Sequence, residues 1–209
     1  MAAPADITIK NLSGEWLMES SLGTPTDAVL SLQGMGWVTR KALSLATVTI
    51  YIHEYPDSEK PEIYHVDGQS VLSGGIQGNK ECRTLDWQQR EHTDNIFGKL
   101  VGQSRHFEGI QNIDIQTSVG NAEDDARVAK FLKGETLVDG SKSEGFLEED
   151  AFMQSFVQNS ESGWTAEQIW GFEIIDGKRL HTRRVAVTKG GKVEMARLVY
   201  SFKSRKTEA

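Results

Sequence analysis

Residues 34–41 read Gly34-Met35-Gly36-Trp37-Val38-Thr39-Arg40-Lys41, and they follow a Gly14-Glu15-Trp16 motif after one short segment. That segment starts with Thr24-Pro25-Thr26-Asp27, a typical helix start, because a hydroxyl can cap free N–H groups, proline is tolerated in the first turn and aspartate favours the positive helix end. Gly34 suits the helix end. Apolar and long side chains then recur at a spacing of four, which predicts a second helix over residues 36–46. The β-branched run over residues 47–53 predicts a strand. We therefore expect strand, two helices and strand over residues 12–52.

The rest of the chain favours sheet. Strands are predicted near residues 62–66, 81–91, 96–107, 110–118, 153–158, 166–174, 179–188 and 193–203. Hairpin turns are expected at Thr93-Asp94-Asn95, Asp176-Gly177-Lys178 and Lys189-Gly190-Gly191. Strand ends this close together favour an antiparallel meander. We expect one domain over residues 1–209, with a first strand in 6–20, a helical lid in 25–46 and meander strands in 47–203. Long loops are expected near 57–80, where residues 67–80 are rich in Gly and Ser, and near 120–150, with a short helix around 122–132.

Three segments resemble known proteins. Leu12-Ser13-Gly14-Glu15-Trp16 resembles the first strand of the calycin superfamily, and residues 32–41 resemble the turn and second lid helix of intracellular fatty-acid-binding proteins. The run from Gln168 to Tyr200 resembles their last three strands. The resemblance implies an all-β fold, a single antiparallel up-and-down β-barrel of about ten strands, calycin- or lipocalin-like. It also implies a short helix-turn-helix lid near residues 25–45 over a ligand cavity.

The chain also departs from that family. It is longer than a typical member, and Phe172 stands about where carboxylate-binding members carry an arginine before the turn. The usual Arg-x-Tyr of the last strand is here Arg197-Leu198-Val199-Tyr200, one residue longer. Alternation along a strand then puts Arg197 and Tyr200 on opposite faces unless a bulge intervenes. These departures from the family imply a ligand that is less acidic than a fatty acid, or one that is held differently.

Composition narrows the function classes. The formal charge of -7 argues against a general nucleic-acid binder, which needs Lys and Arg on phosphates. There is no apolar run long enough for a transmembrane helix, and the first residues lack the pattern of a signal peptide. Cys82 is the single cysteine, so an internal disulfide is ruled out and a cytoplasmic location is the simplest interpretation. Monomer and dimer both stay open.

Candidate ligand-binding residues are aromatic or polar side chains on the lid and the expected strands. A cavity that binds a ligand combines apolar walls with a few convergent polar groups. Which face of each strand points inward is left open, and solvent exposure is the competing interpretation for each polar residue. The candidates are Trp37, Tyr51, His53, Trp87, Gln89, Gln103, Arg105, Trp170, Phe172, Arg183, Arg197 and Tyr200.

Catalytic candidates are proton carriers. Histidine is a proton carrier near neutral pH, so His53, His106 and His181 are candidates, and Glu173 is another if a desolvated barrel raises its pKa. Nucleophile elbows, phosphate loops and dinucleotide fingerprints do not occur. The histidines lack zinc-ligand spacing, so we expect neither a metal nor a cofactor. A haem on a proximal histidine is the remaining cofactor alternative.

The leading functional prediction is the binding of a hydrophobic small molecule, namely a lipid, a fatty-acid-like compound, a terpenoid or a polyketide. The alternative is a cofactor-independent enzyme of small-molecule biosynthesis. Such an enzyme would catalyse cyclisation, isomerisation or elimination in the same cavity, mainly by orienting its substrate. A third interpretation is a protein-interaction barrel with a filled core.

Overall fold

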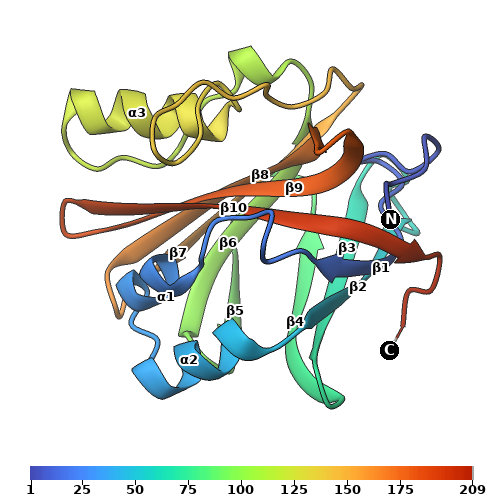
Figure 1. The fold of residues 1–209 in the computed structure, drawn as a ribbon, viewed down its shortest axis with the longest axis horizontal. Coiled ribbons are helices and arrows are strands. Elements are labelled where there is room, and N and C mark those ends of the chain that lie inside the picture. The colour runs from blue at the N-terminus through green and yellow to red at the C-terminus, as the bar shows by residue number, and fades with distance from the viewer. Residues whose placement is uncertain (209) are drawn as a thin grey trace.

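The computed structural model describes residues 1–208, which form a nearly closed antiparallel barrel with helices at one end and on one side (Figure 1). Within these residues, ten strands follow the order β4-β3-β2-β1-β10-β9-β8-β7-β6-β5. The expected all-β up-and-down barrel is confirmed. The strands are β1 (Gly14–Met18), β2 (Val48–Pro56), β3 (Tyr64–Leu72), β4 (Ile76–Thr84), β5 (Arg90–Asp94), β6 (Gly98–Phe107), β7 (Phe152–Asn159), β8 (Trp164–Ile175), β9 (Lys178–Lys189) and β10 (Lys192–Ser204).

The barrel is closed by β1 and left open between β4 and β5. β1 pairs with β2 on one side and with β10 on the other, which joins the two ends of the chain. β4 and β5 are the outer strands of the sheet order. Between them, Asn79 Nδ2 donates a hydrogen bond of 2.7 Å to Asp94 Oδ2. The wall therefore has one seam that side chains bridge instead of a backbone ladder.

Two short helices form the expected lid, α1 (Asp27–Leu32) and α2 (Trp37–Leu45). Arg40 ties them together, because its Nε lies 2.9 Å from Asp27 Oδ1 and its Nη1 donates to Met35 O. Thr26 is the N-cap of α1 but makes no side-chain capping bond. α2 buries none of its side chains, and Trp37 remains 67% exposed. The lid is thus present where expected, but the face of α2 that carries Trp37 points to solvent.

The far end of the barrel is a packed core. Trp16 is fully buried and donates from Nε1 to Leu12 O at 3.1 Å. Its ring packs against Phe172, His181 and Phe202, with centroid distances of 6.2, 5.3 and 5.3 Å. The segment before β1 adds further buried apolar side chains to this cluster, Ile7, Ile9 and Leu12.

An outer layer covers β8, β9 and β10 on the side away from the barrel interior (Figure 1). It consists of the 3-10 helix η1 (Ile110–Asn112), helix α3 (Ala122–Leu132) and the segments around them. Phe131 and Leu132 of this layer pack in one cluster with Ile169 and Ala186 of the sheet. α3 begins where expected, and the Asn121 side chain caps it by accepting from the backbone N–H of Asp124.

Two expectations about the chain are wrong. Residues 67–80 are not a loop, because they belong to the β3–β4 hairpin, which turns at Gly74 and Gly75 with φ of 86° and 77°. The glycines inside these strands concealed the alternation. Residues 110–118 are not a strand, because the backbone N–H groups of Gln116 and Thr117 donate to the Glu167 carboxylate instead of a neighbouring strand.

None of the helices in the described part of the chain has both the length and the apolar character that a membrane crossing requires.

Candidate functional site

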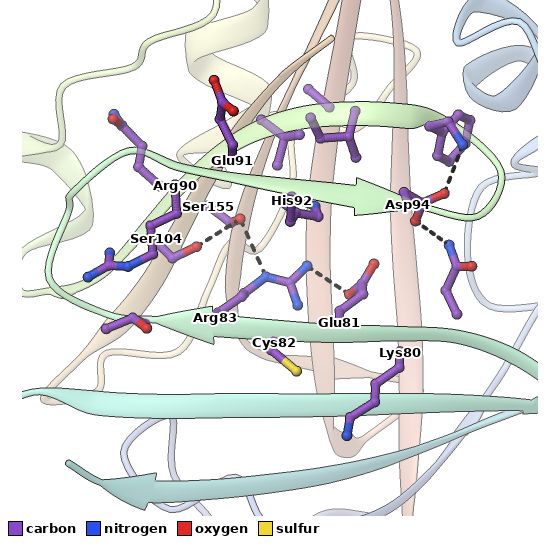
Figure 2. Close-up of a pocket in the computed structure, with 18 of the residues that line it drawn as sticks. Lys80, Glu81, Cys82, Arg83, Arg90, Glu91, His92, Asp94, Ser104 and Ser155 are labelled. Carbon is purple, nitrogen blue, oxygen red and sulfur yellow. Dashed lines mark hydrogen bonds and ion pairs between the residues drawn. The ribbon is translucent and has the colours of Figure 1, made fainter. Parts of the chain in front are cut away.

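Two adjoining cavities reach into the barrel. One has a volume of about 470 Å³ and lies at the seam between β4 and β5, where residues on both sides of β4 line it, such as Arg83 and Cys82 (Figure 2). The other has about 280 Å³ and lies beneath α1 and α2, and we call it the deeper cavity because the buried residues Trp170, Arg183 and Tyr200 line it. Side chains from β4, β8 and the β5–β6 turn border both cavities, namely Asn79, Glu81, Arg83, Phe97 and Gln168. The expectation of a hollow interior under a lid is therefore met.

The deeper cavity has apolar walls and a polar floor. Alternation along the strands brings apolar side chains of β2 and β3 to its wall, and the lid adds more, namely Leu30, Met35, Leu43, Ile50, Ile52, Val66 and Leu72. The opposite side is formed by Gln168 and Trp170 of β8, Arg183 of β9 and Tyr200 of β10. Apolar walls with a few convergent polar groups are typical of a site for a small organic molecule.

Arg183 is held between two aromatic rings. Its guanidinium carbon lies 3.5 Å from the ring centroid of Trp170 and 4.9 Å from that of Tyr200. Trp170 and Arg183 face each other across the β8–β9 ladder, so the register of one hairpin sets the first contact. Cation–π contacts of this kind favour a guanidinium where water is scarce.

His181 orients Arg183 from behind. The Nε of Arg183 donates to His181 Nε2 at 3.2 Å, and the Nδ1 of His181 lies 3.0 Å from Gly171 O. Burial and the nearby Arg183 lower the pKa of His181 well below its usual value. A neutral ring that donates from Nδ1 and accepts at Nε2 satisfies both contacts. His181 is therefore a positioning residue for Arg183.

A second guanidinium enters the space from β4 (Figure 2). Arg83 Nη2 lies 2.7 Å from Glu81 Oε2, and Arg83 Nε lies 3.5 Å from Ser155 Oγ. Figure 2 shows Glu81 and Arg83 pointing into the cavity, whereas Lys80 and Cys82 point to the other side of the strand. The positive charge of Arg83 lowers the pKa of Glu81, so this pair stays ionised. The carboxylate thus neutralises Arg83.

The structure brings only some of the candidate ligand residues together. Trp170, Arg183 and Tyr200 line the deeper cavity, and Gln103 borders the wider one. His181 lies directly behind Arg183. These residues come from β6, β8, β9 and β10, and their side chains share the inner surface because successive strands are in register.

Other candidates lie away from both cavities. Tyr51 and His53 are on the opposite face of β2 from the cavity residues Ile50 and Ile52. Phe172 belongs to the packed end of the barrel, where the guanidinium carbon of Arg179 lies 3.7 Å from its ring centroid. Tyr51 and His53 share one face of β2, as strand alternation requires, but this face is on the outside of the barrel.

Three further candidates lie near the start of β5 and on β6. The Arg105 guanidinium carbon lies 4.3 Å from the ring centroid of Trp87, and Arg105 Nε donates to Gln154 Oε1. Gln89 is exposed to solvent, and so is Trp37 on α2. Strand β4 ends at Thr84, so the expected alternation through residue 91 does not hold.

Arg197 and Glu173 belong to an ion cluster on the outer side of the sheet. Arg184 Nε and Arg197 Nη1 lie 2.9 and 3.1 Å from the Glu173 carboxylate, and Thr182 Oγ1 donates to it at 2.9 Å. β10 pairs with β9 in continuous register over both positions, so Arg197 and Tyr200 face opposite sides as the spacing predicted. Glu173 thus lies away from the cavities and binds Arg184, which donates hydrogen bonds to the outer layer at Phe131 O and Thr136 O.

His106 lies near the packed end of the barrel. Its Nε2 is 3.3 Å from Glu54 Oε1, while Glu54 Oε2 accepts from the backbone N–H of Leu12. Sequence reasoning missed Glu81, Arg83 and Gln168 as cavity residues. The alternation Glu81-x-Arg83 is the available signal, but it directly follows residues 67–80, which are rich in Gly and Ser and predict a loop.

No model of a known protein family matches the sequence. The chain is 31% identical over 202 residues to pericyclase pydY of Acremonium sp., covering 97% of each chain. It is 29% identical over 201 residues to the probable pericyclase scpY of Mollisia scopiformis, covering 96% of this chain and 94% of the relative. Lipid binding protein 8 of Caenorhabditis elegans has the same fold, with a TM-score of 0.50 at 12% identity over 95% of this chain and 100% of that chain. The chain belongs to the family of pericyclase pydY.

Proposed function

We propose that the barrel binds a hydrophobic small molecule in its two adjoining cavities and catalyses the cyclisation of that molecule by a pericyclic reaction. The observation that carries the proposal is the match to pericyclase pydY over 97% of both chains. The interior supports it, because a combined space with apolar walls and polar groups on one side suits a flexible, mostly apolar substrate.

Binding follows from the apolar walls. Each Å² of apolar surface that leaves water contributes about 25 cal/mol before the costs of association. The walls under the lid come from aliphatic side chains, such as Ile50 and Leu198, and from Trp170. This part of the proposal is common to a carrier and to an enzyme.

Catalysis would come from shape and from hydrogen-bond donors. A pericyclic reaction redistributes electrons around a ring of reacting atoms in one step, so the main requirement is a folded substrate with its reacting carbons in contact. A donor on a carbonyl conjugated to those carbons stabilises the transition state further. Arg183 and Tyr200 supply such donors at the floor of the deeper cavity.

The test measures binding and conversion separately. Binding is followed with the fluorescent probe 1-anilinonaphthalene-8-sulfonate, and compounds that co-purify are identified by mass spectrometry of the denatured protein. Conversion is followed by liquid chromatography with linear polyenes that carry a conjugated carbonyl. An intramolecular pericyclic product keeps the mass of its substrate, elutes at a new time and loses polyene absorption.

We expect the protein to accelerate formation of such a product above the rate in buffer. Trp170→Ala should abolish the acceleration, whereas Trp87→Ala, on a ring outside both cavities, should retain it. If the co-purified compound binds but no substrate is converted, the protein is a carrier and the catalytic part of the proposal is wrong. Absence of probe binding would overturn the ligand-binding barrel itself.

We also propose that the protein is located in the cytoplasm and does not bind nucleic acid. Cys82 is exposed and is the chain's single cysteine, which suits a reducing cytoplasmic compartment. The net charge of -7 disfavours nucleic acid as a partner. We propose the small molecule as the partner of this chain.

A further inference from the structure

Arg183 is a buried cation that forms no ion pair with another residue of the described chain. Its residue is only 6% exposed, and its Nε is used by the neutral His181. In the part of the chain that the structure describes, no carboxylate forms an ion pair with Arg183, because Glu81 pairs with Arg83. A buried charge without a counter-charge is costly, so such a group is expected to have a partner outside the chain.

The charges that line the deeper cavity give the sign of that partner. Two guanidinium groups, Arg83 and Arg183, border it together with one carboxylate, Glu81. Burial raises the pKa of Tyr200, so its phenol remains neutral. The described residues around this cavity therefore carry one net positive charge, which a single anion would balance.

The free polar atoms near Arg183 are donors. Gln168 uses its side-chain oxygen to accept from Trp170 Nε1 at 2.9 Å, which leaves its NH₂ group for the cavity. The Tyr200 hydroxyl has no hydrogen-bond partner among the residues that the structure describes, and it borders the same space. The guanidinium, the phenol and the amide can all donate, so the complementary ligand group is an acceptor.

We propose that the ligand of this cavity carries an ionised oxygen acid, a carboxylate or the enolate of a 1,3-dicarbonyl group, and that Arg183 binds it with help from Tyr200 and Gln168. The inference rests on the proposed binding of a small molecule and adds the chemical class of its polar end. It also resolves the alternative left by the missing Arg-x-Tyr spacing: the ligand is acidic, and an arginine of β9 holds it. The apolar remainder of the ligand then lies against Ile50 and Leu198.

The test compares acidic ligands with their neutral forms. One arm uses 11-(dansylamino)undecanoic acid and its methyl ester, and the other uses 2-dodecanoyl-1,3-cyclohexanedione and its methyl enol ether. Direct fluorescence and displacement titrations give the dissociation constants at pH 7.5. A charge-assisted contact is worth about tenfold or more in affinity, so we expect each acid that fits to bind at least ~10-fold tighter than its neutral form. The two arms tell a carboxylate from an enolate.

Arg183→Gln should remove this preference while the neutral forms still bind, which also shows that the variant is folded. Tyr200→Phe should reduce the preference by a few-fold. Arg127→Gln removes a guanidinium from the surface of α3 and should leave every constant unchanged. If Arg183→Gln does not fold, the comparison of acid and neutral form on the wild-type protein decides.

Equal affinity of the wild-type protein for acid and neutral form overturns the inference and leaves the proposed function standing. An acid preference that survives in Arg183→Gln overturns the assignment to Arg183. Failure of all four compounds to bind the wild-type protein overturns the proposed function, and the inference falls with it.

Discussion

Replacing Glu173 with glutamine would remove the single negative charge from the ion cluster between the sheet and its outer layer. The Glu173 carboxylate accepts four hydrogen bonds, from Thr182, from two nitrogens of Arg184 and from Arg197, at 2.9–3.1 Å. Arg184 is fully buried, and its remaining contacts are to neutral oxygens. Glu173→Gln therefore leaves a buried guanidinium without a counter-charge.

The expected loss is about 3–5 kcal/mol of unfolding free energy, the cost of removing one partner from a buried ion pair. For a chain of 209 residues this lowers Tm by roughly 6–20 °C, since 1 kcal/mol corresponds to about 2–4 °C at this size. Urea unfolding followed by the fluorescence of the buried Trp16, Trp164 and Trp170 measures the loss. Glu194→Gln, on an exposed side chain of β10, is the matched control and should change stability by less than about 0.5 kcal/mol.

Because Glu173 lies away from both cavities, the folded variant should keep the ligand affinity of the wild-type protein. A loss below about 1 kcal/mol would refute the energetic argument. Impaired ligand binding at a temperature where the variant is fully folded would refute the structural role, and would return Glu173 to the catalytic candidates.

Two more predictions concern the packing around His181. Its pKa is lowered in the folded state, so the unfolded chain binds more protons and unfolding free energy should fall as pH drops below ~6.5, by up to about 1.4 kcal/mol per unit. Urea midpoints between pH 7.5 and 5.0 measure this, and an equal slope in His181→Gln would contradict it. Gly171→Ala would place a methyl group 2.6 Å from a ring carbon of Phe146, so we expect a loss of about 1–3 kcal/mol by thermal unfolding. An unchanged Tm would show that the ring moves freely.

The turns and long strands were predictable from local sequence. Asp176 and Gly177 have φ of 50° and 70°, the left-handed pair that a two-residue hairpin requires. That turn alone sets the β8–β9 register, in which Trp170 lies opposite Arg183. The most important contact of the candidate site was therefore implied by a four-residue turn signal.

The lining of the site was harder to predict because it depends on distant pairings. A strand has two faces, and Tyr51 and Arg183 looked equally suitable until the closure of the sheet fixed which face is inner. Glu81 neutralises Arg83 instead of Arg183, and this depends on where β4 lies relative to β9. Which arginine pairs with Glu81 depends on the three-dimensional arrangement of distant strands, so a short stretch of sequence cannot predict it.

The seam between β4 and β5 leaves the barrel wall without a continuous backbone ladder. In a fully closed barrel this ladder fixes the circumference, whereas here the circumference changes when β4 and β5 move relative to each other. The two strands are joined by the contact of Asn79 with Asp94, and a side-chain contact of this kind can lengthen without breaking any strand pairing. The two edges of the sheet can therefore move relative to each other while the nine strand pairings among the described residues keep their register.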